Sequence, residues 1–198
     1  MSSNPAELSK NDVLADLMSR RSHWPLQLPA PSDAELHAAF EVAMRAPDHA
    51  SLRPWRFIVI RDDALIKLGE VFASAAIQRN ATDGGKRSQS QALAAPMIIA
   101  VGAACAANAN VPIIEQVISA GAAAMNLLNA LHLLKYGAYW ASGDNAYDRS
   151  VASALGLNGE TDHLLGFIYV GSPVNPKRQK SRPSSNDVVT YWTGSLTR

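Results

Sequence analysis

Two short segments of this chain concentrate residue types that bind a phosphorylated ligand. The first is Arg20-Arg21-Ser22, and the second runs from Arg45 through His49 to Arg53-Pro54-Trp55. Guanidinium groups and hydroxyls at the ends of packed elements hold phosphate through charge-assisted hydrogen bonds. Both segments adjoin a predicted helix, and the second opens onto an apolar strand. The pattern therefore predicts a site for a phosphorylated, planar ligand.

The same residues also have ordinary structural interpretations. Arg20 and Arg21 follow the first predicted helix, where cations complement the helix dipole without any ligand. Arg45 is similarly placed before Pro47, which ends the next helix. Trp55 is expected to pack. Spacing alone leaves ligand binding and dipole capping both open.

Other chemistries find less support in the sequence. The five histidines show no close pairing at the spacing of metal ligands, so we expect no metal site. Asp48, His49 and Ser51 could form a hydrolase triad, but residues so close in sequence rarely point at one another. There is no Gly-x-Ser-x-Gly elbow, no Walker loop and no Gly-x-Gly-x-x-Gly. Hydrolysis and the common nucleotide folds are therefore disfavoured.

Size and composition indicate one globular domain over residues 1–198. Apolar residues make up 47%, charged residues 18%, and the net charge is +1. That balance argues against disorder and against a nucleic-acid partner. The single cysteine, Cys105, excludes an internal disulfide and reads as a small buried residue. The first twelve residues are polar, and no apolar run approaches the roughly 18 residues of a membrane span. We expect a cytoplasmic protein that does not enter a membrane.

The elements that must position these residues are mixed helices and strands, which predicts the α+β class. Ser32 and Glu35 form a capping-box pattern at the start of the second helix. The polar, glycine- and serine-rich residues 80–91 predict a loop. Hydrophobic periodicity predicts helices over about 6–21, 32–46, 63–79, 112–135 and 147–155, and strands over about 56–60, 97–101 and 164–170.

The longest predicted helix, 112–135, carries small residues on all sides in the stretch Ser119 to Ala124. Such a surface allows another backbone to approach closely, so we expect a central helix at a subunit interface. A high-propensity core helix is the alternative. The tail after Ser172 combines prolines and cations with the pair Tyr191-Trp192. We expect it to lie across a partner subunit.

Taken together, these segments resemble the nitroreductase family of flavoproteins, and most closely its small YdjA-type bacterial branch. The resemblance covers about residues 10–175, nearly the whole chain, and the motifs occur in the family's order. The motifs are Arg20-Arg21-Ser22; Arg45-Ala46-Pro47-Asp48-His49 with Pro54-Trp55; Glu115-Gln116 with Ser119-Ala120-Gly121; Trp140-Ala141-Ser142-Gly143; and Gly166-Phe167-Ile168-Tyr169-Val170-Gly171.

The resemblance implies a nitroreductase-like fold, with a mixed or antiparallel sheet surrounded by helices. It also implies a homodimer with FMN at the subunit interface. By this resemblance, Arg20, Arg21 and Ser22 contact the FMN phosphate and ribityl chain. The tail segment Lys180-Ser181-Arg182-Pro183 resembles the phosphate-binding tail of larger members, which adds Lys180 and Arg182 as candidates.

The resemblance also assigns residues to the flavin ring. Arg45 and His49 are implied to reach the FMN of the other subunit. Trp140, Ala141 and Ser142 are implied to line the isoalloxazine. Reduction places negative charge near flavin N1 and the C2 carbonyl, and Arg45 is the first candidate to stabilise it.

The implied activity is NAD(P)H-dependent reduction of nitroaromatics, quinones or similar acceptors. Hydride passes from NAD(P)H to flavin N5, the nicotinamide leaves, and the acceptor takes its place, giving ping-pong kinetics. The chemistry needs no protein acid or base, so we expect no catalytic side chain. A protein that stores FMN or senses redox state without turnover remains an alternative. A specialised dehalogenase or flavin-cleaving enzyme is another, although the insertions typical of those enzymes are not apparent.

Two positions depart from the family pattern. Arg53 stands where a glutamine before Pro-Trp is common, and Ala141 stands where the YdjA type is expected to carry arginine. One cation near the flavin is therefore missing. We expect that Arg53 could replace it.

Overall fold

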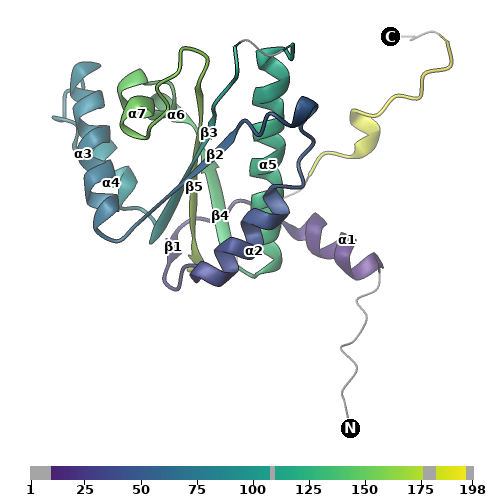
Figure 1. Cartoon of the computed structure of the whole chain (residues 1–198). Helices are drawn as coiled ribbons and strands as arrows, with labels where there is room; N and C mark the ends of the chain where they lie inside the picture. Colours follow the sequence, from purple (N-terminus) through teal and green to yellow (C-terminus); the bar gives the residue numbers. More distant parts are fainter. Residues whose placement is uncertain (1–9, 108–109, 176–181, 195–198) are drawn as a thin grey trace.

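An antiparallel sheet of five strands forms the centre of the molecule (Figure 1). The structure is a computed structural model that describes residues 10–107, 110–175 and 182–194. The long strand β5 pairs with β3 on one side and β4 on the other, while β2 pairs with β3 and β1 with the end of β5. The strands are β1 (Leu26–Gln27), β2 (Trp55–Arg61), β3 (Met97–Ala103), β4 (Gly137–Ala141) and β5 (His163–Pro173).

Helices cover both faces of the sheet, which confirms the predicted α+β class (Figure 1). The first face carries α2 (Asp33–Ala43) and α5 (Ile113–Leu133), with α1 (Lys10–Ser19) beside α5. The second face carries α3 (Asp63–Gln78), α4 (Lys86–Ala92), α6 (Gly143–Ala146) and α7 (Arg149–Ala154). Short 3₁₀ turns are η1 (His49–Ser51) and η2 (Ser185–Asp187). Within the described residues, no helix is both long and apolar enough to cross a membrane.

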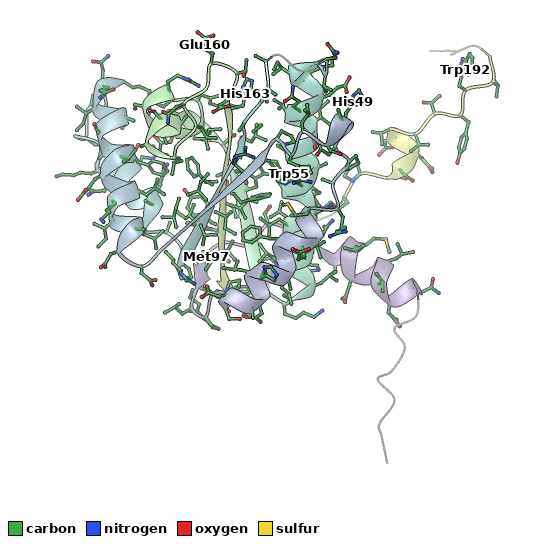
Figure 2. The ribbon with its side chains drawn as sticks, in the orientation of Figure 1. His49, Trp55, Met97, Glu160, His163 and Trp192 are labelled. Atoms are coloured by element: carbon green, nitrogen blue, oxygen red, sulfur yellow. The ribbon has the colours of Figure 1, made fainter. Side chains whose placement is uncertain are left out.

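Strand β3 shows why the sheet is covered on both sides. It begins at Met97 (Figure 2), and all its residues are buried. Because side chains alternate across a strand, Ile99 and Val101 pack with α2 and α5, whereas Ile98 and Ala100 pack with α3. A continuous apolar run is what such a doubly covered strand requires. The sequence predicted this strand correctly, and the structure extends it to Ala103.

The loop predicted at 80–91 is confirmed over 80–85 and wrong in its second half, which forms α4. The carboxylate of Asp83 starts the helix by accepting hydrogen bonds from the Gly85 and Arg87 N–H groups, both at 2.9 Å. Gly85 has φ +78° and lies against the backbone of Ala73, so the turn into α4 depends on its lacking a side chain. The polar composition of the segment predicted a loop, but hydrogen bonds to Asp83 and packing on α3 stabilise a helix there.

The other predicted elements are confirmed with shifted ends. Helices expected over 32–46, 63–79 and 112–135 are α2, α3 and α5. The strand expected at 164–170 runs longer, as β5. Residues 139–143, for which the sequence predicted no helix or strand, belong to β4 and the start of α6.

The capping box that begins α2 is present and gives a first prediction. Glu35 Oε2 accepts hydrogen bonds from the Ser32 hydroxyl (2.6 Å), the Ser32 N–H (2.9 Å) and the Tyr136 hydroxyl (3.0 Å). The Ser32 side chain, then its backbone, and Tyr136 together lower the pKa of Glu35. We expect Ser32→Ala to reduce the free energy of unfolding by about 1 kcal/mol at neutral pH.

The pH dependence of that loss follows from the direction of the pKa shift. A carboxylate with a lowered folded pKa contributes stability above its unfolded pKa, about 4.3, and loses it as the pH falls through the folded value. Urea unfolding of both proteins at pH 7 and near pH 3 measures the effect. The difference should be smaller in acid; an equal difference at both pH values would contradict the role given to Glu35.

Candidate functional site

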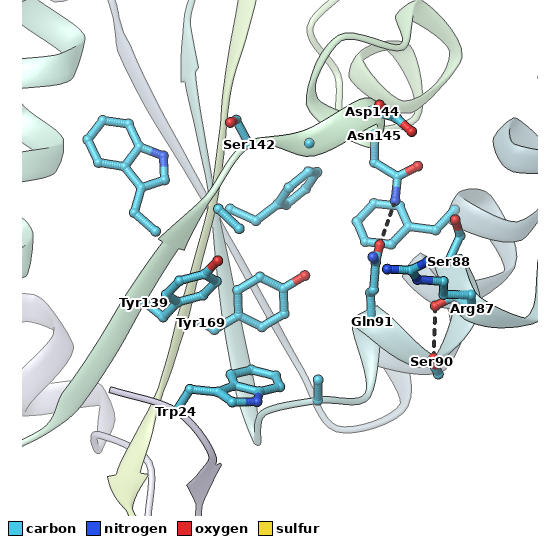
Figure 3. A pocket seen from close by; sticks show the side chains of 16 residues that line it. Trp24, Arg87, Ser88, Ser90, Gln91, Tyr139, Ser142, Asp144, Asn145 and Tyr169 are labelled. Atoms are coloured by element: carbon cyan, nitrogen blue, oxygen red, sulfur yellow. Dashed lines mark hydrogen bonds between the residues drawn. The ribbon is translucent and has the colours of Figure 1, made fainter. Parts of the chain in front are cut away.

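A cavity of about 1060 Å³ lies between α4 and the paired strands β4 and β5 (Figure 3). One wall is aromatic, with Trp24, Tyr139 and Tyr169 together on the strand side. The opposite wall is polar, with Arg87 and Gln91 on α4. A cavity with an apolar wall facing a few polar groups suits a planar ligand that has one polar edge. We call it the β4–α4 cavity.

The register of the sheet builds the aromatic wall. Tyr139 on β4 is directly opposite Tyr169 on β5, and their ring centroids are 6.2 Å apart. Trp24 completes the cluster at 6.0 Å from each tyrosine. Burial, with a smaller contribution from the charge of Tyr139, raises the pKa of Tyr169 to about 12. Tyr169 therefore remains a neutral phenol at physiological pH.

The polar wall consists of residues that sequence reasoning missed. Arg87 and Gln91 lie on the helix that the sequence predicted as a loop. Asn145 follows on α6, is only 6% exposed, and donates through Nδ2 to Gln91 Oε1 at 3.4 Å. Among the residues that line the cavity, Arg87 is the only one with a permanent positive charge.

Trp140, Ala141 and Ser142, predicted to line a flavin ring, all border this cavity. Trp140 and Ala141 end β4, where Ala141 pairs with Phe167 of β5, and Ser142 follows as the N-cap of α6. The Trp140 indole N–H donates to the Leu165 carbonyl at 3.2 Å, which fixes the ring. The contact of these three residues with a flavin ring stays a prediction, and the two walls of the cavity were not predicted from the sequence.

The segment Arg20-Arg21-Ser22 connects α1 to the edge of β4. Ser22 forms a parallel bridge with Ala138, and the His23 N–H donates to the Ala138 carbonyl at 3.0 Å. Trp24, which enters the aromatic wall, follows directly. Arg20, Arg21 and Trp24 are thus parts of one continuous segment, which is attached to β4 at Ser22 and His23.

A second guanidinium from the far end of the chain meets Arg20. Arg182 donates through Nη2 to the Arg20 carbonyl at 3.4 Å. Burial, and then the positive charge of Arg182, lower the pKa of Arg20. Bringing two cations together is unfavourable, and an anion between them would relieve the repulsion. Lys180, the other predicted tail contact, lies outside the described residues.

The structure does not bring Arg45 and His49 to this cavity. The Arg45 guanidinium is exposed and lies 3.4 Å from the Glu41 carboxylate. Nδ1 of His49 lies 2.7 Å from Oε2 of Glu115 at the start of α5 (Figure 2). If these residues contact a ligand, it is one bound outside this chain's own cavity.

Asp48, His49 and Ser51 do not form a hydrolase triad. Asp48 accepts a hydrogen bond from the Arg53 N–H at 2.8 Å, while His49 pairs with Glu115. Arg53, expected to replace the cation missing at Ala141, is exposed and does not line the cavity. The cavity is instead lined by the guanidinium of Arg87.

The remaining candidate groups carry no site in the part of the chain that the structure describes. No group of three or more histidine, cysteine or carboxylate side chains there could hold a metal ion. Cys105 is buried, as expected, and burial, followed by the charge of Asp162, raises the pKa of its thiol. A thiol with a raised pKa is a poor nucleophile.

Comparison with known proteins gives a consistent result. The model of the family described as "Nitroreductase family" matches residues 17–172. The protein called "Putative NAD(P)H nitroreductase YdjA" in Escherichia coli (strain K12) is 34% identical over 183 residues, which are 91% of this chain and 100% of that protein. The resemblance inferred from the motifs is thereby confirmed.

Solved structures show the same fold. The nitroreductase-like family protein from Bacillus cereus superposes with a TM-score of 0.79 at 18% identity, covering 98% of this chain and 100% of that one. A "putative nitroreductase in complex with fmn" from Desulfovibrio desulfuricans has a TM-score of 0.71 at 26% identity, covering 92% and 98%. The expected fold is confirmed.

Proposed function

This chain belongs to the nitroreductase family of oxidoreductases, and we propose that it is an FMN-dependent NAD(P)H oxidoreductase that reduces nitroaromatics, quinones or similar acceptors. One observation carries the proposal. A single segment along β4 bears Arg20 at one end and Trp24, in the aromatic wall, at the other. A ligand with a phosphate and a flat ring matches that arrangement, and a relative of the same fold has FMN bound.

The residues present fit FMN by their chemistry. Arg20, Arg21 and Ser22, with Arg182 from the tail, would hold the phosphate and ribityl chain. The flat ring would occupy the β4–α4 cavity beside Trp140, Ala141 and Ser142, between the aromatic wall and the polar wall. An isoalloxazine has a dimethylbenzene end and a pyrimidine end that carries two carbonyls, so each end would find a wall of matching polarity.

FMN, when bound, supplies the hydride and electron chemistry, and the protein binds and orients it. Arg87 lies in the cavity and is positioned to stabilise negative charge on the polar end of the ring. Tyr169 stays protonated, so the aromatic wall adds no opposing negative charge. We assign no side chain to proton transfer.

The protein is proposed to act as a homodimer. Apolar side chains remain exposed along one side of α5, where Ile114 and Ile118 are each 62% exposed, and on α1, where Met18 is 73% exposed. Apolar patches of this kind mark contact surfaces. In a dimer formed through them, Arg45 and His49 would reach the partner's FMN. The cytoplasmic location stays a prediction.

The absorption spectrum of the purified protein tests the FMN assignment. We expect bound-flavin bands, directly or after FMN is added, and a molar mass in solution of twice the 21.2 kDa chain. NADPH oxidation with a nitroaromatic or a quinone then tests turnover. Flavin bands without turnover would favour a storage or redox-sensing protein, and no FMN binding would refute the proposal.

A further inference from the structure

A chain of hydrogen bonds enters the β4–α4 cavity from behind its polar wall. Arg79, directly after α3, donates through Nη2 to Asn145 Oδ1 at 2.7 Å. Asn145 Nδ2 donates in turn to Gln91 Oε1 at 3.4 Å (Figure 3). The other Arg79 amino group donates to Asp148, which caps α7. Arg79 itself does not line the cavity.

The chemistry of arginine sets the donor and acceptor of each hydrogen bond from Arg79 through Asn145 to Gln91. A guanidinium has five N–H donors and no acceptor, so the atom it meets on Asn145 must be the amide oxygen. The Asn145 nitrogen then faces Gln91 and requires an oxygen there. Gln91 consequently turns its Nε2, with two N–H donors, away from Asn145. Among the described residues, that nitrogen has no hydrogen-bond partner.

The series of hydrogen bonds begins at the charged carboxylate of Asp148, which the protein holds in a fixed position. Asp148 is only 13% exposed in its side chain and binds both the Ser150 N–H and hydroxyl. Burial alone would raise the pKa of Asp148, but the hydrogen bonds from Ser150 and Arg79 outweigh it and lower the pKa. The carboxylate thus stays charged at neutral pH and holds Arg79 in a fixed orientation.

We propose that Arg79 is a positioning residue, which acts through Asn145 to make Gln91 present N–H donors to the polar end of the bound ring. This inference rests on the FMN assignment above. Donors fixed in advance stabilise the reduced, negatively charged ring more than the oxidised, neutral one. Arg79 would therefore help to set the ratio of affinities for reduced and oxidised FMN, which is the reduction potential.

The test is the midpoint potential of bound FMN in Arg79→Gln and Gln91→Leu. We expect each change to weaken binding of reduced FMN about tenfold relative to oxidised FMN, because a hydrogen bond to a charged acceptor is stronger than one to a neutral acceptor. Tenfold corresponds to about 30 mV for a two-electron couple. The double variant should shift no further than the larger single shift, because both residues act in one chain.

Two further variants separate positioning from a structural role. Arg61 ends β2, does not line the cavity, and forms another arginine–carboxylate pair with Asp33 of α2 at 2.7 Å. Arg61→Gln removes that pair and should leave the potential unchanged. Arg79→Lys can keep a charge beside Asp148 but lacks the second amino group needed for Asn145. It should retain most of the stability and still lower the potential.

The outcomes are distinguishable. A potential unchanged in Arg79→Gln, or in Gln91→Leu where Arg79→Gln does not fold, overturns the inference while the FMN assignment stands. A wild-type protein that binds no FMN overturns the proposed function and this inference together. An equal shift in Arg61→Gln would show that the effect is not specific to the chain of hydrogen bonds, and would also overturn it.

Discussion

Arg20→Ala is expected to weaken FMN binding about 10- to 100-fold. A hydrogen bond to a charged group contributes about 1.5 to 3 kcal/mol, and each 1.4 kcal/mol is a factor of ten in affinity. Arg20 is partly buried and lies near Arg182 at the start of the segment that leads into the aromatic wall. Fluorescence titration of the apoprotein with FMN measures the change, and the purified variant should be pale.

The competing explanation makes a different prediction. If Arg20 only complements the dipole of α1, its loss should cost about 0.3 to 1 kcal/mol of stability and leave FMN affinity unchanged. Lys135→Ala is the matched control, because Lys135 lies 3.4 Å from Asp16 and helps to dock α1 without belonging to the proposed phosphate site. A yellow, fully active Arg20→Ala protein would show that the phosphate assignment is wrong.

Arg182 extends this prediction to the tail. The repulsion between two guanidiniums is relieved only when a ligand anion is present, so the residues should be coupled in FMN binding. Arg182→Ala should weaken binding less than Arg20→Ala, since Arg182 is exposed. Additive effects in the double variant would mean that the two cations do not share one anion.

Local patterns in the sequence were sufficient for elements whose reasons are local. The Ser32–Glu35 capping box fixes the start of α2, and the apolar run from Met97 predicts a buried strand. The loop prediction failed over 86–91 because α4 is stabilised by Asp83 and by packing against α3, and neither produces a helical periodicity in the sequence. Arg87 and Gln91 were missed for the same reason.

The cavity could be predicted only in part, since its walls depend on strand register. Tyr139 and Tyr169 are thirty positions apart in the sequence and meet because β4 pairs with β5. The resemblance identified the end of β4 through Trp140. It placed the flavin's stabilising cation on Arg45, which this chain directs away from its own cavity. A register prediction for β4 and β5 would have exposed the aromatic wall.

Gly166→Ala is expected to have the largest effect on stability. Gly166 has φ +130°, and a Cβ there would lie 2.5 Å from the Ala141 carbonyl oxygen and 2.8 Å from the Trp140 indole nitrogen. The backbone strain and the overpacking each cost about 1 to 3 kcal/mol. We expect a loss of roughly 3 kcal/mol or more in the free energy of unfolding, measured by urea denaturation.

The clash also connects stability to the proposed site. The clash between the added methyl and the Ala141 carbonyl can be relieved only if the Ala141 backbone moves. Ala141 and Ser142 border the β4–α4 cavity. Folded Gly166→Ala protein should therefore bind FMN more weakly as well. Gly156→Ala separates the two causes, because Gly156 has φ +83° but no atom within 4 Å of an added Cβ. It should lose only about 1 kcal/mol and keep its FMN affinity. If both variants lose equal stability and neither loses FMN, the close approach of β5 to the end of β4 does not shape the flavin site.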